Sequence, residues 1–429
     1  MGLNTSVSTV CMALQLRNDL KKHIELCYKQ KTQAIKFPEK LEEKEVLFKN
    51  TKRQLPMPFV IYADFECYTE KINEPQHGST TKYQRHVPSG FSYMIVSTAP
   101  QHTQEPVVYR GEKVVETFLD RLLEEHYSIN TILSHVQPMV LSPEEEAQHQ
   151  RATDCFICGE PFGAERPVRD HDHLTGKYRG PAHNECNLAF KYQRLNNSKK
   201  NPSYIVPVVF HNLRGYDGHL LMEAIGKYKQ RRITCIANNS ERYISFSLGG
   251  LRFIDSIQFM GTSLEQLVNN LQNDEFKLLR KYIDGKDKQE LMLRKGVYPY
   301  DYVDKPEKLE ETRLPPKQEF YSKLYDEGIS DEDYEHAQNV WRTFNCQTLG
   351  DYHDVYLESD VLLLADVFES FRKMTLATYK LDPAHYFTAP GLSWDAMLKL
   401  TRVKLQLLDD PDMYLMVEAG IRGGVSLII

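Results

Sequence analysis

The chain has 429 residues, of which 41% are hydrophobic and 26% charged, with 53 basic against 59 acidic residues. Such a composition, with only 22 glycines and 21 prolines, excludes collagen-like, disordered and small disulfide-stabilised proteins, and the length indicates about two or three domains. No apolar run approaches the roughly 20 residues of a membrane span and the N-terminus has no signal-peptide pattern, so we expect a soluble intracellular chain without membrane contact.

Residues 1–50 are hydrophilic, and helical spacing predicts a helical extension. Cys11, His23 and Cys27 are three candidate ligands of a small zinc knuckle. The fourth ligand is missing, because the position three before Cys11 is Ser8. The knuckle is therefore predicted to be degenerate.

Residues 51–150 predict the first half of an α/β domain. An apolar run from Phe59 ends in Asp64 and Glu66, as a buried strand does at a sheet edge. Further strands are predicted at 91–96 and 107–109, a helix at 112–125 and a linker at 143–151.

The strand and helix pattern resumes over residues 202–380. We predict a strand at 204–210, a glycine turn at 213–218, a helix at 219–228 and a hairpin of 243–248 with 251–257. Asp301–Glu335 holds twelve acidic and five basic residues and is predicted to be a solvated surface helix. The simplest organisation is one α/β domain interrupted by a module at 151–201.

Three segments of this domain carry candidate catalytic residues. Asp64 and Glu66 alternate on one strand and so share a face. Asp217 follows the glycine turn, and Tyr356 and Asp360 are four apart on one helical face. Each segment alone is weak, since strand-end charges, N-cap aspartates and structural pairs are common. Together, four carboxylates from strand, turn and helix can hold two divalent ions ~3.5–4 Å apart for phosphoryl transfer.

These segments resemble the Exo I (D-x-E), Exo II (N-x₂₋₃-[FY]-D) and Exo III (Y-x₃-D) motifs of the 3′–5′ proofreading domain of family B DNA polymerases. The sequences at 62–66, 314–317, 341–345 and 387–397 are similar to those of the protein-primed polymerases of Polinton or Maverick transposons, of the organellar and viral type. The resemblance implies an α/β, RNase H-like fold with a mixed sheet.

The same resemblance implies the roles of particular residues. Asp64, Glu66, Asp217 and Asp360 would bind Mg²⁺ or Mn²⁺, and Tyr356 would position the attacking water. Asn212 and Tyr216 would touch the single-stranded 3′ end of a primer-template. A terminal priming protein is the implied partner, DNA replication the implied process, and the nucleus the implied compartment if the chain comes from a eukaryotic mobile element.

Residues 381–429 would begin the link to a polymerase palm. The chain contains no D-x₂-SLYP, K-x₃-N-S-x-Y-G or D-T-D motif. We therefore expect no DNA polymerisation from this chain alone.

The inserted module carries two pairs of soft ligands. Cys155 and Cys158, and likewise His183 and Cys186, are separated by two residues, a spacing that suits tetrahedral Zn²⁺. The clustering of these cysteines favours metal over disulfides.

Residues between and after the pairs resemble the ββα-metal nucleases of the recombination endonuclease VII type. By that resemblance Asp170 and Asn187 would bind Mg²⁺, and His171 would be the general base. The alternative is a structural insertion with a DNA-binding basic face, because Arg166–Lys200 holds eight basic residues against three acidic ones. The basic residues we expect to contact DNA are Lys191, Arg194, Lys199 and Lys200.

Three functions therefore compete. The leading prediction is a 3′–5′ exonuclease. The second is a structure-selective endonuclease whose active site lies in the zinc module. The third is a non-catalytic DNA-binding remnant. The sequence retains every proposed ligand, which argues against this third alternative.

Overall fold

The computed structural model of the chain describes residues 24, 25, 28, 37–40, 43–72, 84–195, 203–239, 242–323 and 326–421. Contacts divide the chain into one unit of residues 1–47 and 403–429 and a second unit of residues 48–402. In the first unit, β1 (Glu45–Val46) pairs antiparallel with β11 (Leu405–Gln406), and helix α13 (Pro411–Gly420) follows. The candidate knuckle residues Cys11, His23 and Cys27 lie outside the described residues, as does most of the expected helical extension.

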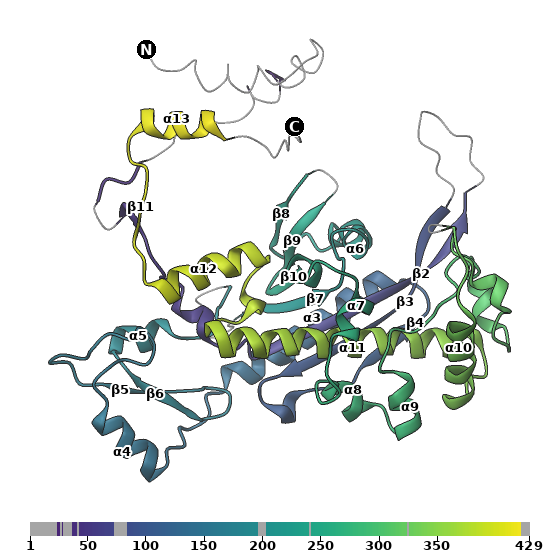
Figure 1. Cartoon of the computed structure of the whole chain (residues 1–429), viewed down its shortest axis with the longest axis horizontal. Helices are drawn as coiled ribbons and strands as arrows, with labels where there is room; N and C mark the ends of the chain where they lie inside the picture. The colour runs from purple at the N-terminus through teal and green to yellow at the C-terminus, as the bar shows by residue number, and fades with distance from the viewer. Residues whose placement is uncertain are drawn as a thin grey trace, which may run out of the picture. The chain divides into compact units, whose positions relative to one another are not determined.

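A mixed seven-stranded sheet forms the centre of the second unit (Figure 1), in the order β4-β3-β2-β7-β10-β9-β8. β2, β7 and β10 are parallel to one another, and the remaining neighbours are antiparallel. The strands are β2 (Phe59–Lys71), β3 (Gln84–Ser97), β4 (Val107–Arg110), β7 (Val206–Phe210), β8 (Ile233–Ala237), β9 (Tyr243–Leu248) and β10 (Leu251–Asp255). This mixed α/β sheet fits the predicted RNase H-like fold, and the predicted hairpin of β9 and β10 is confirmed.

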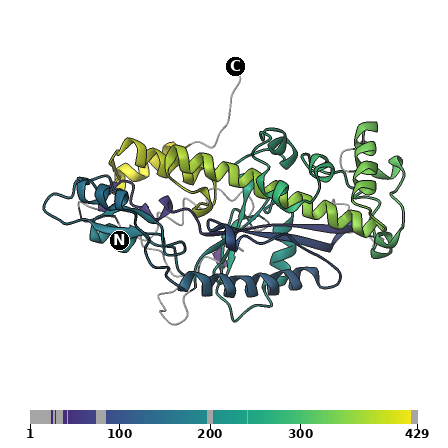
Figure 2. The same ribbon diagram turned by 90° about the horizontal axis from the view of Figure 1, so that it is seen from below.

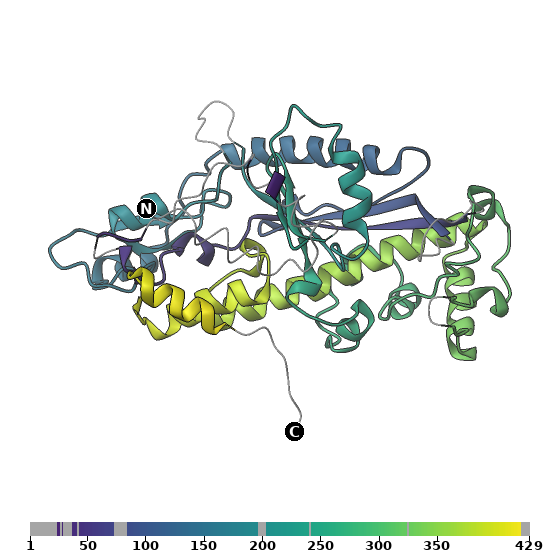
Figure 3. The same ribbon diagram turned by 90° about the horizontal axis from the view of Figure 1, so that it is seen from above.

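Two long helices cover the two faces of the sheet (Figures 2 and 3): α3 (Val114–Ser134) on one side and α11 (Leu349–Tyr379) on the other. Alternation along β2 decides which side chain meets which helix. Phe59 and Ile61 join the core beneath α3, while Val60 and Tyr62 join the core beneath α11. Burial on both faces explains why β2 is an almost continuous apolar run.

The inserted module lies between α3 and β7 in the chain. It contains α4 (Pro143–Arg151), the antiparallel pair β5 (Val168–His171) and β6 (Tyr178–Ala182), and α5 (Asn184–Ala189). Its small core packs Cys155, Ile157 and Phe162 against Leu55 of the main domain. The order β5, β6, α5 agrees with the expected ββα arrangement.

Two local expectations are wrong. The predicted linker at 143–151 is helix α4, because Ser142 and Glu145 form a reciprocal capping box and Pro143 occupies the first turn. The predicted acidic surface helix is mostly irregular, and only α10 (Asp331–Thr343) is α-helical there, since prolines interrupt the segment before residue 317.

The remaining elements complete the second unit. The α-helices are α6 (Asp217–Ile225), α7 (Leu264–Asn269), α8 (Lys277–Tyr282), α9 (Lys286–Leu291) and α12 (Ala389–Thr401). The 3₁₀ turns are η2 (Thr51–Gln54), η3 (Pro100–His102), η4 (Ser256–Gln258), η5 (Pro306–Glu310), η6 (Lys317–Phe320) and η7 (Pro383–His385). Within the described ranges, no helix is both long and apolar enough to cross a bilayer.

Candidate active site

Acidic side chains from β2 and α11 converge where the helix crosses the sheet. Asp64, Glu66 and Asp360 each offer a carboxylate oxygen within 4.8 Å of the others, and we call them the carboxylate cluster. Glu66 and Asp360 are buried and Asp64 is half-buried. Carboxylates at this spacing are typical ligands of divalent cations.

Local structure explains why the carboxylate cluster forms. Asp64 and Glu66 continue the β2 alternation that points Val60 and Tyr62 toward α11. Asp360 faces them from the middle of α11, one turn after Tyr356. The two sequence segments, almost 300 residues apart, therefore present acids to one another across a single packed interface.

Asp217 lies at the start of α6, outside the 4.8 Å limit of the carboxylate cluster. It is nevertheless an electrostatic neighbour, because burial first, and then the charges of Asp64 and Glu66, raise its pKa well above the ordinary value. Its Oδ1 atom and the Oδ1 atom of Asp360 are buried without a hydrogen-bond partner among the described residues. Orphaned buried carboxylate oxygens are costly, and a bound cation satisfies them.

The charge of the carboxylate cluster is poorly compensated. Burial and the nearby Asp360 raise the pKa of Asp64 to about 7, and burial and Asp64 raise the pKa of Glu66 well above its ordinary value. Two or more carboxylates held this close cannot all ionise without a counter-charge. The donor set, all oxygens and buried, fits Mg²⁺ or Mn²⁺.

Lys295 is the cation of the site, and the sequence reasoning missed it. Its Nζ atom lies 2.5 Å from Asp360 Oδ2 and 5.1 Å from the centroid of the Tyr356 ring. Although burial opposes it, Asp360 raises the pKa of Lys295 above the usual range, so the ammonium stays charged. A lone lysine carries no motif. The following Gly296 leaves room for the Tyr356 ring, since a Cβ there would come within 2.8 Å of that ring.

Tyr356 is fixed by aromatic neighbours. Its hydroxyl lies 2.7 Å from that of Tyr300, and its ring centroid lies 5.1 Å from that of Tyr298. The aromatic loop Tyr298–Tyr302 thus packs against α11 in its own domain. The hydroxyl of Tyr356 is held beside the carboxylate cluster.

The loop after β7 carries Asn212 and Tyr216. Asp255 shapes this loop, because its carboxylate accepts hydrogen bonds from the backbone N–H groups of Asn212 (2.8 Å) and Arg214 (3.1 Å). Asn212 has a positive φ of 67°, which asparagine tolerates better than most residues. The Tyr216 hydroxyl lies 2.7 Å from His86 Nδ1 on β3, so Tyr216 reaches from the loop after β7 past β2 to β3, close to Glu66.

The inserted module gathers its predicted zinc ligands. Cys155, Cys158, His183 and Cys186 lie with their ligand atoms within 4.8 Å of one another, and we call them the Cys/His cluster. The Sγ atom of Cys158 lies 3.5 Å from His183 Nδ1. Burial alone would raise the pKa of Cys155, but backbone N–H donors, including those of Cys158 and His183, lower it to about 7. Three thiols and one imidazole in this arrangement fit tetrahedral Zn²⁺.

Asp170, the proposed Mg²⁺ ligand of the module, already has a partner. Arg179 donates to both of its oxygens, at 2.6 and 3.1 Å, and this arginine was not singled out from the sequence. The adjacent His171 ring lies 4.9 Å from that of His173. Asn187 is half-buried on α5. No group of three acidic or histidine ligands is found here among the described residues.

The predicted DNA-contacting residues of the module are only partly described. Lys191 and Arg194 are exposed, and Arg194 donates a 2.7 Å hydrogen bond to the Tyr204 hydroxyl. Lys199 and Lys200 lie outside the described residues.

A mixed sheet covered by two helices, with a carboxylate cluster where β2 packs against α11, fits an RNase H-like fold. The chain belongs to the family of DNA polymerase type B, organellar and viral, whose profile matches residues 199–428, more than half of the chain. Residues 133–200 are similar to recombination endonuclease VII. No curated protein matches the chain.

The two family matches imply a DNA-binding, polymerase-related protein and agree with both resemblances drawn from the motifs. Asp217, Tyr356 and Asp360 fall within the polymerase match, whereas β2 with Asp64 and Glu66 precedes it. The narrower likeness to Polinton-type polymerases is not tested by these matches and stays a prediction.

Proposed function

We propose that this chain carries the 3′–5′ exonuclease of a protein-primed type B DNA polymerase and removes 3′ nucleotides from DNA. The observation that carries the proposal is the convergence of Asp64, Glu66 and Asp360, with buried orphaned oxygens on Asp217 and Asp360. Type B polymerase membership supports DNA as the substrate. A terminal priming protein, a role in replication of a mobile element and a nuclear location extend the same proposal.

The four carboxylates Asp64, Glu66, Asp217 and Asp360 would hold two Mg²⁺ or Mn²⁺ ions. When bound there, the ions would neutralise charge on the scissile phosphate and lower the pKa of a water molecule. Tyr356, fixed by the Tyr300 hydroxyl, would orient that water through its own hydroxyl. Lys295 would keep its positive charge beside the phosphate, because its pKa is raised by Asp360.

Digestion of a single-stranded DNA labelled near its 5′ end, in Mg²⁺, tests this function. We expect the wild-type chain to give stepwise 3′ shortening and Asp64→Ala to reduce the rate by about 10³-fold, the scale expected when charge stabilisation is lost. Asp331→Asn is the matched control, since Asp331 is almost fully exposed on α10 and its ion-pair partner is Lys317 rather than a member of the carboxylate cluster. Unchanged trimming by a folded Asp64→Ala variant would refute the proposal.

We propose a structural Zn²⁺ in the Cys/His cluster and, as a second candidate function, cleavage of branched DNA by the module. The similarity of residues 133–200 to recombination endonuclease VII favours it. His171 would be the base, and Asp170 with Asn187 would bind Mg²⁺ once Arg179 releases Asp170.

Cleavage of a labelled four-way junction tests this second function. Internal cuts that disappear in His171→Ala but persist in Asp64→Ala would establish it. A chain that binds DNA and cuts neither substrate would instead be the non-catalytic remnant.

A further inference from the structure

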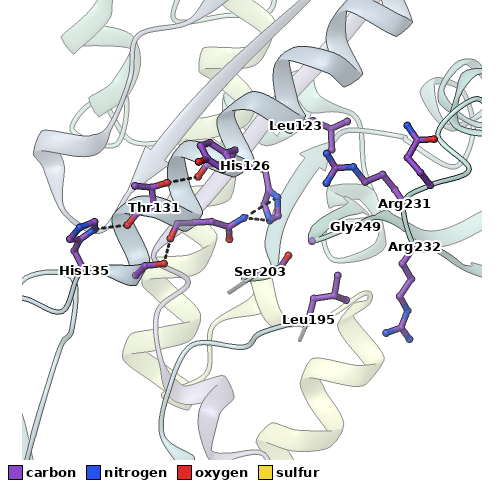
Figure 4. Close-up of a pocket in the computed structure, with 14 residues that line it drawn as sticks. Leu123, His126, Thr131, His135, Leu195, Ser203, Arg231, Arg232 and Gly249 are labelled. Carbon is purple, nitrogen blue, oxygen red and sulfur yellow. Dashed lines mark hydrogen bonds between the residues drawn. The ribbon is translucent and has the colours of Figure 1, made fainter. Parts of the chain in front are cut away.

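Two adjoining cavities lie beside the edge strand β8, and the same residues Leu195, Arg232 and Gly249 line both. Their volumes are about 590 and 290 Å³. Figure 4 shows the larger one, with the side chains of α3 on one wall and Arg231 and Arg232 on the other. We call the two cavities together the arginine groove.

The arginine groove is strongly basic in a chain whose net charge is −6. Arg194, Arg231, Arg232 and Arg252 line it, and no Asp or Glu is among the described residues that do so. None of these four guanidinium groups has a carboxylate partner among the described residues. A cleft lined by one sign of charge concentrates the opposite ion.

Arg252 makes the strongest case for a missing anion. It lies on β10 and is half-buried, with its guanidinium 5.3 Å from the centroid of the Phe387 ring. Burial, and then the nearby Arg53, lower its pKa to about 10. A half-buried charge without a counter-ion is unfavourable, whereas an ordinary solvated surface arginine has no such cost.

Aromatic side chains accompany the arginines. Phe387 lines the smaller cavity, and Tyr127, which is 75% exposed, lines the larger one. A basic groove with an exposed ring, here that of Tyr127, is a combination that binds single-stranded nucleic acid, because phosphates pair with arginines while bases stack on rings. Phe387 is half-buried, and the guanidinium of Arg252 lies over its ring. Thr234 and Ser247, whose hydroxyls hydrogen-bond to each other, also line the smaller cavity.

The position of the arginine groove agrees with this ligand. Gln193 and Leu195, on its rim, belong to the segment that leads out of the inserted module. Arg252 lies three residues before Asp255 on β10, about 10 Å along the strand, and Asp255 holds the Asn212 loop beside the carboxylate cluster. The groove thus lies between the module and the part of the sheet where the candidate exonuclease residues lie.

We propose that the arginine groove is a binding site for the phosphate backbone of a single DNA strand, separate from both nuclease-like sites. The strand would place successive phosphates on Arg231, Arg232 and the Arg252 side of the groove. The proposal does not require either nuclease-like site to be active.

Fluorescence anisotropy with a labelled 12-nucleotide oligothymidylate tests the groove. The full chain carrying Asp64→Ala is used throughout, so that the strand is not shortened and a failure of the exonuclease proposal does not affect the result. We expect Arg231→Gln with Arg232→Gln to weaken binding roughly tenfold and to reduce the slope of log affinity against log salt by about 0.7 per lost contact. Arg252→Gln should add to both effects.

Arg342→Gln is the matched control, because Arg342 is an exposed arginine on α10 whose partners lie on its own helix. Arg231 and Arg232 are also exposed, so the double variant should keep the wild-type unfolding midpoint. Unchanged affinity and salt slope in a folded double variant would overturn the proposal. An equal loss for blunt duplex DNA would overturn its restriction to single strands.

Discussion

The carboxylate cluster and the inserted module differ in how the charges of their buried acidic side chains are compensated. In the cluster, Asp64, Glu66 and Asp360 face one another with Lys295 as the nearby cation, and the Oδ1 atom of Asp360 is buried without a hydrogen-bond partner. In the module, Asp170 is fully engaged by Arg179. A large sheet-and-helix core can therefore hold like charges together, whereas the small module pairs its buried Asp170 with an arginine. On the proposed zinc site, the Cys/His cluster would add to the stability of the module.

Core size explains this difference. α11 is buried along much of its length against the sheet, so the position of Asp360 is fixed by apolar packing rather than by its own contacts. The module's own core is a handful of residues around Cys155. Small domains with so little core usually require metals or disulfides.

The largest effect is expected for loss of a ligand from the Cys/His cluster of the module. We expect Cys186→Ser to abolish Zn²⁺ binding and to unfold the module locally, because metal binding and folding are coupled in such small sites. Zinc content by mass spectrometry and amide exchange over residues 152–192 measure the two effects. Cys235→Ser, at an exposed cysteine on β8, is the control. Exonuclease activity should persist, and its parallel loss would mean that the two regions are not independent.

The next effect concerns the carboxylate cluster. Asp360→Asn should lower 3′ trimming by about 10³-fold, equivalent to about 4 kcal/mol, through loss of a metal ligand. The same change should alter stability little, because the relief of repulsion from Asp64 and Glu66 is offset by the loss of the buried ion pair with Lys295, which keeps Asp64 as a charged neighbour. Rates and urea midpoints measured together check both statements. A variant that is inactive because it is unfolded would contradict the view that apolar packing positions this helix.

A smaller effect is expected at the end of α11, where Arg372 donates to Asp382 at 2.6 Å and to the Met57 carbonyl at 2.9 Å. Both side chains are buried. Asp382→Asn should cost about 3 kcal/mol in the free energy of unfolding, because it leaves Arg372 with only Glu369 as a charged partner. Chemical denaturation measures the loss, and Asp412→Asn, exposed on α13, is its control.

The pH dependence of that pair has a definite sign. Burial would raise the pKa of Asp382, but Arg372 lowers it below the ordinary value. A depressed carboxyl pKa stabilises the fold above the unfolded-state pKa, and this contribution is lost as pH falls through the folded value. The stability difference between wild type and Asp382→Asn should therefore be constant near neutrality and shrink below about pH 4. A difference that grows on acidification would contradict the assignment.

The smallest effect is expected for the N-terminal cap of α4, the helix that was not predicted from the sequence. Ser142→Ala removes the side-chain cap of α4 and should destabilise the module by about 1 kcal/mol. Local amide exchange in residues 143–151 measures it, with Ser134→Ala, at the exposed end of α3, as the control. No change would mean that the ion pair of Glu146 with Arg169 holds α4 without the cap.

The sequence alone determined the elements whose signals are local. Alternation and apolar runs predicted β2, β7 and the β9–β10 hairpin, and two-residue spacing predicted the members of the Cys/His cluster. These predictions succeeded because side-chain periodicity and ligand spacing are properties of short segments. The capping box of α4 was equally local and was overlooked, since Ser142 and Glu145 stand three apart as such a box requires.

Contacts between segments that are far apart in the chain became visible in the tertiary structure. It brought Asp360 to Asp64 and Glu66, left Asp217 just outside that group, placed Lys295 on Asp360, and joined Arg179 to Asp170. It also collected four arginines without an acid around the edge of the sheet. The motif segments predicted the grouping of the acids. The contacts of Lys295 and Arg179 and the grouping of the arginines have no sequence signal, because each depends on packing between separate segments and on charges that act through space.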